Sequence, residues 1–521
     1  MHLDILVCGF VVRFMQAFLE SSLTLVVGLL VAGVFRRMVG SASTRRLFRS
    51  GIRGWLRGWV IGMLLPVCSL GVIPVARELR RAGVSGGTVL AFVLAAPLLN
   101  PLSFFYALTL TEPSVVICFC VASLLLSTLA GWLWDRVFAP GSSNAEDQAV
   151  VADEPVPVAG PRRLLAIVVT ASGDWLSSVF GYYLVGLLGS AILAALIPFG
   201  SLQSTMKHSD PTSPYLMLVL AIPIYSSPLP GMMRIGLMFD HGNSIAAAFL
   251  LFSLGIGTNL GLLAWLLRVY RPSRFLPWLL TWLALVISLA LLAEPFLYDT
   301  RKAELDHTHA FDDYANPFPS SGDLGWLLSS MWKRLAERFE AREQLAVGIL
   351  GILTLLGLFL RPPQRYAALE SWLTWQPPPT QNAPPWWNRP IPGPILGGLA
   401  LLGLIVISVV GIYIFYPPPE QTLVDLTQVR ADALVALYTG KYTEAVRHLE
   451  LLDLLVRKLQ VGVYIRTGSL APEARRACEE LCALIEEIRD LISRGHVGDQ
   501  LEPRLKLFEK RYRALRQAFS Q

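Results

Sequence analysis

The sequence is poor in charge, because Asp, Glu, Lys and Arg together make up 16% of its 521 residues whereas 54% are hydrophobic. Several apolar runs reach the roughly 20 residues that span a bilayer, which excludes an ordinary soluble protein. The chain also lacks a Walker-type phosphate-binding motif, so this polypeptide is not expected to hydrolyse ATP. The composition predicts a polytopic membrane protein that is not an enzyme and needs no cofactor.

Cysteines are few, and acidic residues are absent from one basic stretch. Four of the six cysteines lie in or near apolar runs, so no disulfide framework is expected (Cys8, Cys68, Cys118, Cys120, Cys478, Cys482). The first apolar run is long and lacks a basic start, which argues against a cleavable signal. Seven arginines between positions 36 and 57 follow it without an acidic residue, so that loop is predicted to be cytoplasmic and the N-terminus outside. The net charge of +6 favours the anionic membrane leaflet over nucleic acid as a partner.

A stretch from Pro66 to Arg77 interrupts the apolar sequence at membrane depth. Pro66 and Pro74 remove backbone donors and disturb the preceding helical turns. Backbone groups freed in this way are tolerated in a membrane only where they line a cavity or are buried in protein. Arginines flank the stretch on both sides, so both ends are expected on the cytoplasmic side. Residues 54–83 are therefore predicted to form a re-entrant helical hairpin with its tip at 68–71.

A second copy of this stretch lies 157 positions later. That shift pairs residues of both breaks and of the helices after them (Pro66 with Pro223, Ser69 with Ser226, Arg77 with Arg234, Ala91 with Ala248, Phe92 with Phe249, Leu94 with Leu251). A second hairpin is expected over about 215–241. Arginine placement gives each half three crossings, an odd number that orients the two copies oppositely. The sequence thus predicts an inverted-topology repeat, in which paired broken helices mark a binding site.

The predicted fold is an all-α membrane protein with two re-entrant helical hairpins, about eight full crossings and a C-terminal helical soluble domain. It divides into six parts: 1–138, first repeat; 139–163, cytoplasmic linker; 164–293, second repeat; 294–343, extracytoplasmic acidic loop; 344–416, two additional transmembrane helices; and 417–521, extracytoplasmic helical domain. The last assignment rests on apolar residues at helical spacing, such as Leu449, Leu452 and Val456.

The half-helices determine the chemistry expected at the two tips. Each descending half-helix begins near a proline, Pro74 or Pro230, so free amides and the positive end of the helix dipole face the membrane centre. Such a site favours an anion or an electron-rich oxygen. Cys68 adds a soft ligand for a thiophilic centre when it is deprotonated. The alternative is that Cys68 is a small apolar residue packed in a tight turn.

The first tip and the segment after it resemble a known family. Cys68-Ser-Leu-Gly-Val-Ile-Pro-Val-Ala-Arg, followed by Gly83 and by Leu90-Ala-Phe-Val-Leu-Ala-Ala-Pro-Leu-Leu-Asn-Pro, is similar to the predicted-permease family that includes the ArsP-type organoarsenical efflux permeases. The likeness covers roughly residues 10–293, and in the second half Gly257-Thr258-Asn259 resembles the family's second Asn-containing motif. The resemblance implies a permease that in some members exports trivalent arsenicals, with membrane thiols as ligands.

The sequence departs from that family at both tips. Leu70 stands where the family pattern often has a second cysteine, and the second tip carries Tyr225, Ser226 and Ser227 without a cysteine. The predicted substrate-binding residues are Cys68, Ser69, Gly71, Asn100, Ser226, Ser227, Thr258 and Asn259. For Asn100 and Asn259, the alternative is a hydrogen bond between helices.

Three further sets of residues are weaker candidates. Glu20 in the first span is a candidate for proton coupling because a carboxylate is costly in lipid, although a position near the end of the span would let it reach the interface. His307 and His309 lie in an acidic loop that is either a metal site or simply solvated. Cys478 and Cys482 share a helix face, either as core residues or as a redox pair.

Two classes of function remain open at this level. One is a permease of a bacterial cytoplasmic (inner) membrane that moves a small solute, either a trivalent arsenical or an anion, by alternating access around the paired hairpins. The other is a non-transporting membrane scaffold whose outer helical domain binds a protein partner. Polar tips and the intramembrane asparagines favour transport.

Overall fold

Helices joined by turns and loops make up the part of the chain that the computed structural model describes. That part comprises residues 3–100, 113–140, 162–240, 242–298, 310–319, 323–339, 341–375, 416–495 and 501–519 and the single positions 103, 104, 107, 158, 308, 395, 398, 402, 406, 409, 412 and 413. Within it no β-strand occurs, and Lys207 and Asn243 form an isolated bridge. The all-α prediction is confirmed.

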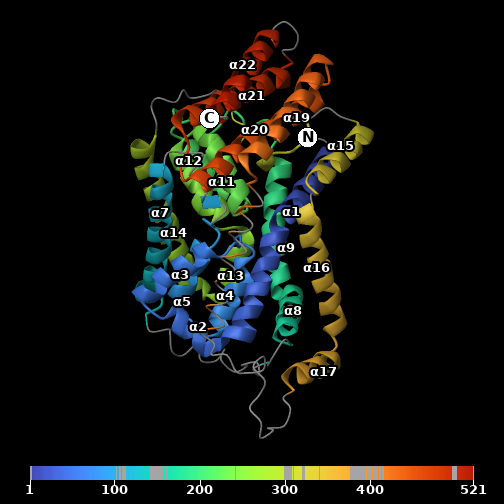
Figure 1. Ribbon diagram of the computed structural model, residues 1–521. Helices are drawn as coiled ribbons and strands as arrows, with labels where there is room; N and C mark the ends of the chain where they lie inside the picture. The colour runs from blue at the N-terminus through green and yellow to red at the C-terminus, as the bar shows by residue number, and fades with distance from the viewer. Residues whose placement is uncertain are drawn as a thin grey trace. The chain divides into compact units, whose positions relative to one another are not determined.

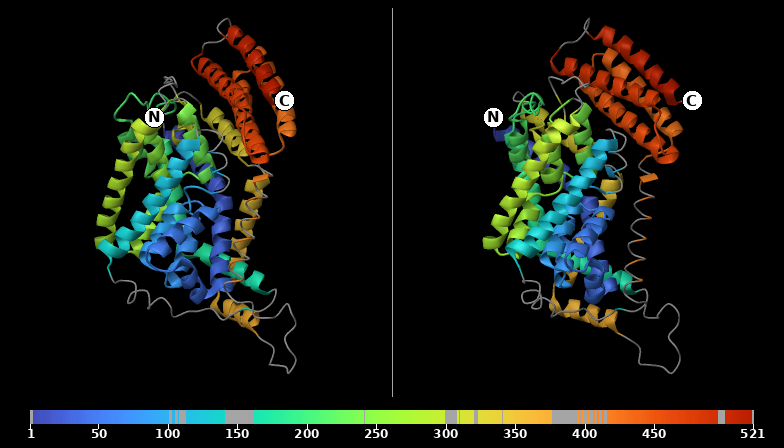
Figure 2. Two further views of the ribbon diagram at one scale, coloured as in Figure 1. Left: turned by 60° about the vertical axis from the view of Figure 1, so that its left-hand side comes forward. Right: turned by 90° about the vertical axis from the view of Figure 1, so that its left-hand side faces the viewer.

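Among the described residues, five helices are long and apolar enough to cross a membrane. They are Leu3–Phe48 (α1 Leu3–Val34, η1 Phe35–Val39 and α2 Gly40–Phe48), Val115–Phe138 (most of α7 Pro113–Leu133, with η2 Trp134–Phe138), Arg162–Leu196 (α8 Arg162–Asp174, η4 Trp175–Val179 and α9 Phe180–Leu196), α14 Pro272–Leu297 and α16 Ala341–Leu360. Helix α1 packs against α8, α9 and α16, and α14 runs along the opposite side of the same unit (Figures 1 and 2).

A sixth span is formed when one bent pair of helices is counted together. It consists of Ile245–Ile256 (α12 Ile245–Leu250 with η5 Leu251–Ile256) and α13 Leu260–Val269, which meet at an angle of 58°. Five to six spans are fewer than the eight that the sequence predicts. The end of one predicted crossing, Thr88–Leu110, and most of another, Pro394–Tyr416, fall outside the described residues.

The helix breaks at both places that the prolines predict. In the first half, α3 Ile52–Leu64 and α4 Val72–Arg81 are separated by residues 65–71. In the second half, α10 Ser213–Ala221 and α11 Pro228–Asp240 are separated by residues 222–227. The descending helices begin at Val72 and Pro228, two residues before the prolines at 74 and 230, because proline fits the first turn of a helix.

Helix α5 (Gly86–Ala95) begins with a cap made of two side chains. The Ser85 hydroxyl accepts a hydrogen bond from the amide of Thr88 at 3.4 Å. The carboxylate of Asp135, from η2, accepts the amide of Gly87 at 2.8 Å and the Ser85 hydroxyl at 3.3 Å. A carboxylate is well placed there because the first amides of a helix have no partner within the helix.

Helix α12 begins in the same way in the second half. Ser244 accepts from the amide of Ala247 at 3.2 Å and donates to the carboxylate of Glu294 at 3.0 Å, and Glu294 also accepts the amide of Ala246. Every member of this cap lies 159 positions after its counterpart (Ser244 after Ser85, Ala246 after Gly87, Ala247 after Thr88, Glu294 after Asp135). Both halves therefore build the same local structure.

The spacing of 159 corrects part of the sequence-based register. Arg77 is eight residues before Ser85, whereas Arg234 is ten residues before Ser244. The constant shift of 157 therefore describes the breaks but misaligns by two residues the helices that follow them. The pairings of Ala91, Phe92 and Leu94 with Ala248, Phe249 and Leu251 are wrong for this reason.

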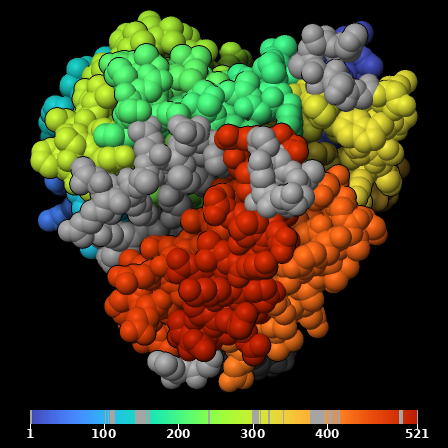
Figure 3. All heavy atoms as spheres, turned by 90° about the horizontal axis from the view of Figure 1, so that it is seen from above, coloured from blue at the N-terminus to red at the C-terminus, as the bar shows by residue number. Residues whose placement is uncertain are grey.

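The C-terminal residues form a compact unit of their own. It contains α19 Pro419–Tyr438, α20 Tyr442–Thr467, α21 Pro472–Ser493 and α22 Glu502–Phe519, which Figure 3 shows in orange to red. Its apolar core includes Leu449, Leu452 and Val456 at the predicted helical spacing. Cys478 and Cys482 are buried in this core as free thiols, which confirms them as core residues.

The remaining helices of the larger unit are η6 Asp312–Tyr314, α15 Leu324–Glu337 and α17 Pro363–Thr374. Near the N-terminal end of α1, Ile5, Cys8 and Val12 pack with Phe318 and with Leu327 of α15 in a small apolar cluster. This cluster fixes the segment after α14 against the start of α1.

Candidate functional site

The first break is held by its own thiol and by an asparagine from the second half. The amide of Gly71 donates to the Cys68 thiol at 3.3 Å, and the side-chain amide of Asn259 donates to the Ser69 hydroxyl at 2.7 Å. Cys68, Ser69 and Asn259 are all fully buried. Three predicted site residues therefore lie close together, with the bent helix of the second half in contact with the tip of the first.

Close packing leaves no space around Gly71. A Cβ atom at Gly28 would lie 1.9 Å from the carbonyl oxygen of Gly71, and a Cβ at Gly71 would lie 2.5 Å from that of Thr24. Only glycine permits the backbones of α1 and of the break to approach so closely. Gly71 thus has a demonstrable packing role in addition to its predicted role at the tip.

The second break turns its serines towards charged side chains. The Ser226 hydroxyl accepts from Arg234 at 2.7 Å, and the amide of Ser227 donates to the carboxylate of Glu20 at 2.7 Å. The neighbouring Tyr225 lies near enough to Cys68 for the phenol and the thiol to interact electrostatically. The two breaks are therefore in contact through Tyr225 and Cys68.

Asn100 and Asn259 act as matching caps 159 positions apart. The side-chain oxygen of Asn100 accepts the amide of Ser103 at 2.8 Å, and that of Asn259 accepts the amide of Leu262 at 2.9 Å. Thr258 donates its hydroxyl to the carbonyl of Leu254 at 3.0 Å. The asparagines thus stabilise broken helices, and Asn259 in addition contacts the opposite tip.

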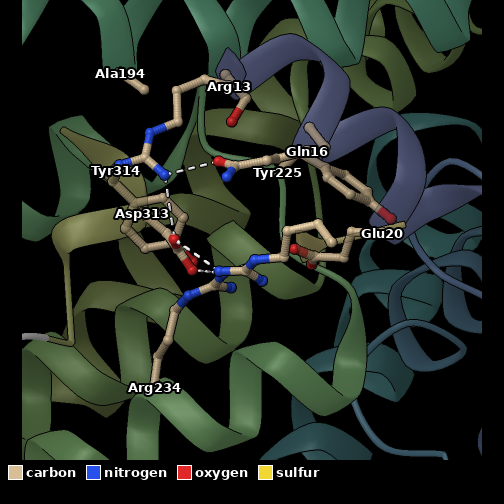
Figure 4. Close-up of a pocket in the computed structure, with 11 residues that line it drawn as sticks. Arg13, Gln16, Glu20, Ala194, Tyr225, Arg234, Asp313 and Tyr314 are labelled. Carbon is tan, nitrogen blue, oxygen red and sulfur yellow. Dashed lines mark hydrogen bonds and ion pairs between the residues drawn. The ribbon is translucent and has the colours of Figure 1, made fainter. Parts of the chain in front are cut away.

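Charged residues converge on a narrow, half-open hollow beside the second break. Arg13 of α1 contacts the carboxylate of Asp313 at 3.2 Å, and Arg234 of α11 contacts it at 2.7 Å (Figure 4). Arg234 also lies 3.6 Å from Glu20 and 4.8 Å from the ring centre of Tyr314. The hollow, which we call the arginine hollow, encloses about 360 Å³ including its open mouth and is lined by Arg13, Gln16, Ala17, Glu20, Ser190, Ala194, Tyr225, Arg234, Asp313, Tyr314 and Arg338.

A second group of charges surrounds Arg77 of the first half. Arg77 donates to the hydroxyl of Ser177 at 2.7 Å and lies 3.4 Å from Asp174, while Arg81 pairs with Glu78. Asp174 and Glu78 are buried, and the helix Arg162–Leu196 is kinked at Ser177. Both Arg77 and Arg234 are in ion pairs, and Arg234 is only 7% exposed.

The contacts of the two arginines correspond under the shift of 157. Arg77 pairs with Ser177, and the equivalent positions are Arg234 and Glu20, which lie 3.6 Å apart. In each case an arginine after one break contacts the long span that begins the other half. This exchange of contacts is what a two-fold relation between the halves produces.

Sequence reasoning missed Arg13, Asp174 and Asp313. Arg13 and Asp174 lie within apolar runs, and a charge in such a run is itself a signal, because isolated charges are costly in a membrane. Asp313 stands among several acidic residues of a polar loop, and nothing local distinguishes it. The predicted metal candidates His307 and His309 lie outside the described residues, and within the described part no group of His, Cys, Asp and Glu side chains is arranged to hold a metal ion.

Comparison with known proteins agrees with the sequence resemblance. The model of a family described as "Predicted permease" (ArsP_1) matches residues 8–294, more than half of the chain. UPF0718 protein YcgR of Bacillus subtilis (strain 168) is 28% identical over 93 residues, which are 18% of this chain and 32% of that protein. The match thus spans about a third of the relative's length, and no solved structure matches the chain. Because the family match extends over both breaks and all the spans between them, the protein belongs to the predicted permease family.

Proposed function

We propose that this protein is a secondary permease that moves a small solute across a bacterial cytoplasmic membrane by alternating access around its two helix breaks. The observation that carries the proposal is that the first break meets the second half at buried polar groups, with Ser69 bonded to Asn259 of the bent helix and Cys68 beside Tyr225 of the second break. Broken helices at membrane depth are tolerated only where they are buried in protein or line a cavity, and polar groups placed there are functional candidates.

The exchanged pairs of Arg77 and Arg234 support an inverted-topology repeat with the hairpins re-entrant, and the repeated caps support an internal repeat. The caps of α5 and α12, the asparagine caps and the exchanged pairs of Arg77 and Arg234 recur at constant spacings. In inverted repeats, rocking of one half against the other exposes a central site to each side in turn. The two arginine-centred clusters, one in each half, are the contacts that such a motion would break alternately.

Two substrate classes fit the tips: a trivalent (organo)arsenical bound through Cys68, or an anion bound by backbone amides and arginines. The first requires a thiolate, since oxygen is a poor ligand for a soft centre. The second needs no thiol. Glu20, which accepts an amide of the second break and lies near Arg234, is the candidate for coupling to protons.

Replacement of Cys68 by Ser separates these two classes. Everted vesicles containing the full chain would be assayed for uptake of arsenite, methylarsenite, phosphate and sulfate, with Cys118→Ser in α7 as the matched control. We expect Cys68→Ser to retain transport, because the second tip already carries serines and Leu70 replaces a second thiol. Loss of all arsenical transport in Cys68→Ser at normal expression, with Cys118→Ser unaffected, would show that the thiol is the ligand.

A bulky side chain at Gly71 is unsuitable for this test. Its Cβ would meet the backbone of α1 at 2.5 Å, so a loss of activity would report packing instead of recognition. Ser69→Ala is the better companion variant, because it removes the partner of Asn259 and adds no volume. We expect it to lower transport of any substrate that enters between the breaks.

The second candidate function is a membrane scaffold whose C-terminal helical unit binds a protein partner. The compact unit formed by α19–α22, which lies beyond the family match, favours this alternative. A chain that transports none of the four solutes above background, while a copy lacking residues 417–521 loses a co-purifying partner, would support the scaffold.

A further inference from the structure

The arginine hollow holds a carboxylate that the protein itself supplies. Asp313 is contacted by Arg234 at 2.7 Å, by Arg13 at 3.2 Å and by Arg338 at 3.3 Å, and these arginines come from three different parts of the chain. Guanidinium groups recognise carboxylates and other oxyanions through planar pairs of donors. The arrangement is that of a binding site for a small oxyanion with one already in place.

The Asp313 carboxylate belongs to a segment that lies outside the family match. Residues 310–319, here called the Asp313 segment, follow α14 and lie beyond residue 294, where the match ends. Hydrogen bonds fix it over the hollow: Arg13 donates to the carbonyl of Ala315 at 2.8 Å, and the amide of Asn316 donates to the carbonyl of Ile197 at 2.8 Å. The repeats thus supply Arg13 and Arg234, whereas the part of the chain after the family match supplies Arg338 and the carboxylate.

The net charge of the hollow is compatible with an added anion. Three arginines and two acids, Glu20 and Asp313, line it, so the lining carries a formal charge of +1 with Asp313 in place and +2 without it. Buried charges without partners are strongly unfavourable. Removal of the Asp313 carboxylate would therefore favour the binding of another anion between the arginines.

Two buried phenols also belong to the lining of the hollow. Tyr225 and Tyr314 are each 3% exposed, and among the described residues neither hydroxyl makes a hydrogen bond of acceptable geometry. Within the chain, Tyr225 interacts with the Cys68 thiol and Tyr314 with the Ser226 hydroxyl. Buried polar groups are nearly always well paired, so both phenols can still take a further partner. A bound oxyanion can accept hydrogen bonds from both phenols.

We propose that the arginine hollow is a binding site for a small oxyanion such as phosphate, sulfate or a carboxylate, and that Asp313 is a tethered ligand which the anion must displace. The proposal deepens the permease function, because it assigns an anion to the approach to the second break, but binding itself does not require transport. As a tethered competitor, Asp313 acts at a high effective concentration and weakens the apparent affinity for free anions.

The test is a binding titration of the purified full chain in lipid nanodiscs with phosphate and with sulfate at constant ionic strength. We expect Asp313→Asn to bind at least tenfold more tightly than the wild type, and Asp313→Asn combined with Arg234→Gln to lose this gain. Asp323→Asn is the matched control, because Asp323 caps α15 through the amide of Trp326 in the same region. Absence of binding by folded Asp313→Asn, or binding that does not depend on Arg234, would overturn the proposal.

A second measurement does not depend on how Asp313→Asn folds. Displacement of Asp313 by an anion should loosen its segment, so a cysteine introduced at the buried Ala310 should react with a maleimide several-fold faster in phosphate or sulfate than in chloride of equal ionic strength. Equal rates in all three salts would count against displacement. Anion binding without transport in vesicles would contradict the permease function and support the anion site. Transport by a chain that binds no anion would support the permease function and contradict the anion site.

Discussion

At the scale of single residues, the two halves neutralise equivalent arginines differently. Arg77 faces the hydroxyl of Ser177 and takes its negative partner from Asp174, at 3.4 Å. Arg234 has a carboxylate, Glu20, at the position equivalent to Ser177, and takes a second one from Asp313. Of these two arginines, only Arg234 takes a partner from outside the repeats, and the ion pair with Asp313 holds the Asp313 segment against the second half.

The ionisation of Asp313 follows from the same contacts. Burial by itself would raise the pKa of this carboxyl group, but Arg338, Arg234 and Arg13 hold its pKa far below the ordinary range. A group with a depressed pKa contributes stability that is present above its unfolded pKa, near 4, and is lost only as the pH falls below that value. Asp313 is consequently a permanent anion at physiological pH, and protonation cannot be what releases it.

Burial also predicts the reactivity of the two C-terminal thiols. Burial raises the pKa of Cys478 and of Cys482 well above the ordinary value, although Gln460 and Arg457 oppose the rise. We expect neither thiol to react with maleimide in the folded chain at pH 8, and both to react in denaturant, as mapped by mass spectrometry of the labelled peptides. Their contribution to stability is present below the unfolded pKa of about 8.5 and declines as the pH rises above it.

The denatured sample is the internal control for this experiment. Labelling of Cys478 or Cys482 in native protein at the rate seen in denaturant would contradict the burial that the structure assigns to them.

At the scale of elements, the breaks were predictable and their partners were not. Proline disrupts the interior of a helix, so Pro66 and Pro223 by themselves predict that the helix breaks at these positions. The ion pair of Arg234 with Asp313 joins residues 79 positions apart, and that of Arg13 with Asp313 joins residues 300 positions apart. Such pairs depend on tertiary packing, and no local pattern specifies them. The two-residue change in register is not specified locally either, because it depends on the residue at which α11, the descending helix of the second half, ends.

The contact between α1 and the first break makes a prediction about stability. Gly28→Ala would place a Cβ 1.9 Å from the carbonyl of Gly71, so the break must shift. Overpacking of this kind typically costs about 1–3 kcal/mol. We expect a lower midpoint of thermal unfolding, measured by tryptophan fluorescence in nanodiscs.

Gly348→Ala in α16 is the matched control. No described atom lies within 4 Å of a Cβ at that position, and alanine is favoured over glycine in a helix by about 1 kcal/mol. This variant should unfold at the wild-type temperature or above it, and a Gly28→Ala midpoint equal to that of Gly348→Ala would show that the close approach is not needed.

At the scale of the whole molecule, the question is how the halves are oriented. The recurrence of the serine and asparagine caps at 159 positions shows that each half builds the same local structure, but the same caps arise in parallel and in inverted repeats. The exchanged contacts of Arg77 with Ser177 and of Arg234 with Glu20 are more informative, because each half reaches across to the first span of the other. Orientation relative to the membrane rests on the arginine bias, which acts during insertion.

The arginine bias predicts opposite sides of the membrane for two positions that are far apart in the chain. The linker 139–163 should face the cytoplasm, because arginines cluster after the first span and before α8, whereas residue 500 in the C-terminal domain should lie outside. Single cysteines at positions 147 and 500, placed in a chain whose six native cysteines are replaced by serine, can be probed with a membrane-impermeant maleimide in intact cells and in everted vesicles. We expect position 500 to react in intact cells and position 147 in everted vesicles. Reaction of both positions in the same preparation would mean that an even number of crossings separates them. The predicted topology places five crossings between them, three in the second repeat and two after it, so this result would contradict it.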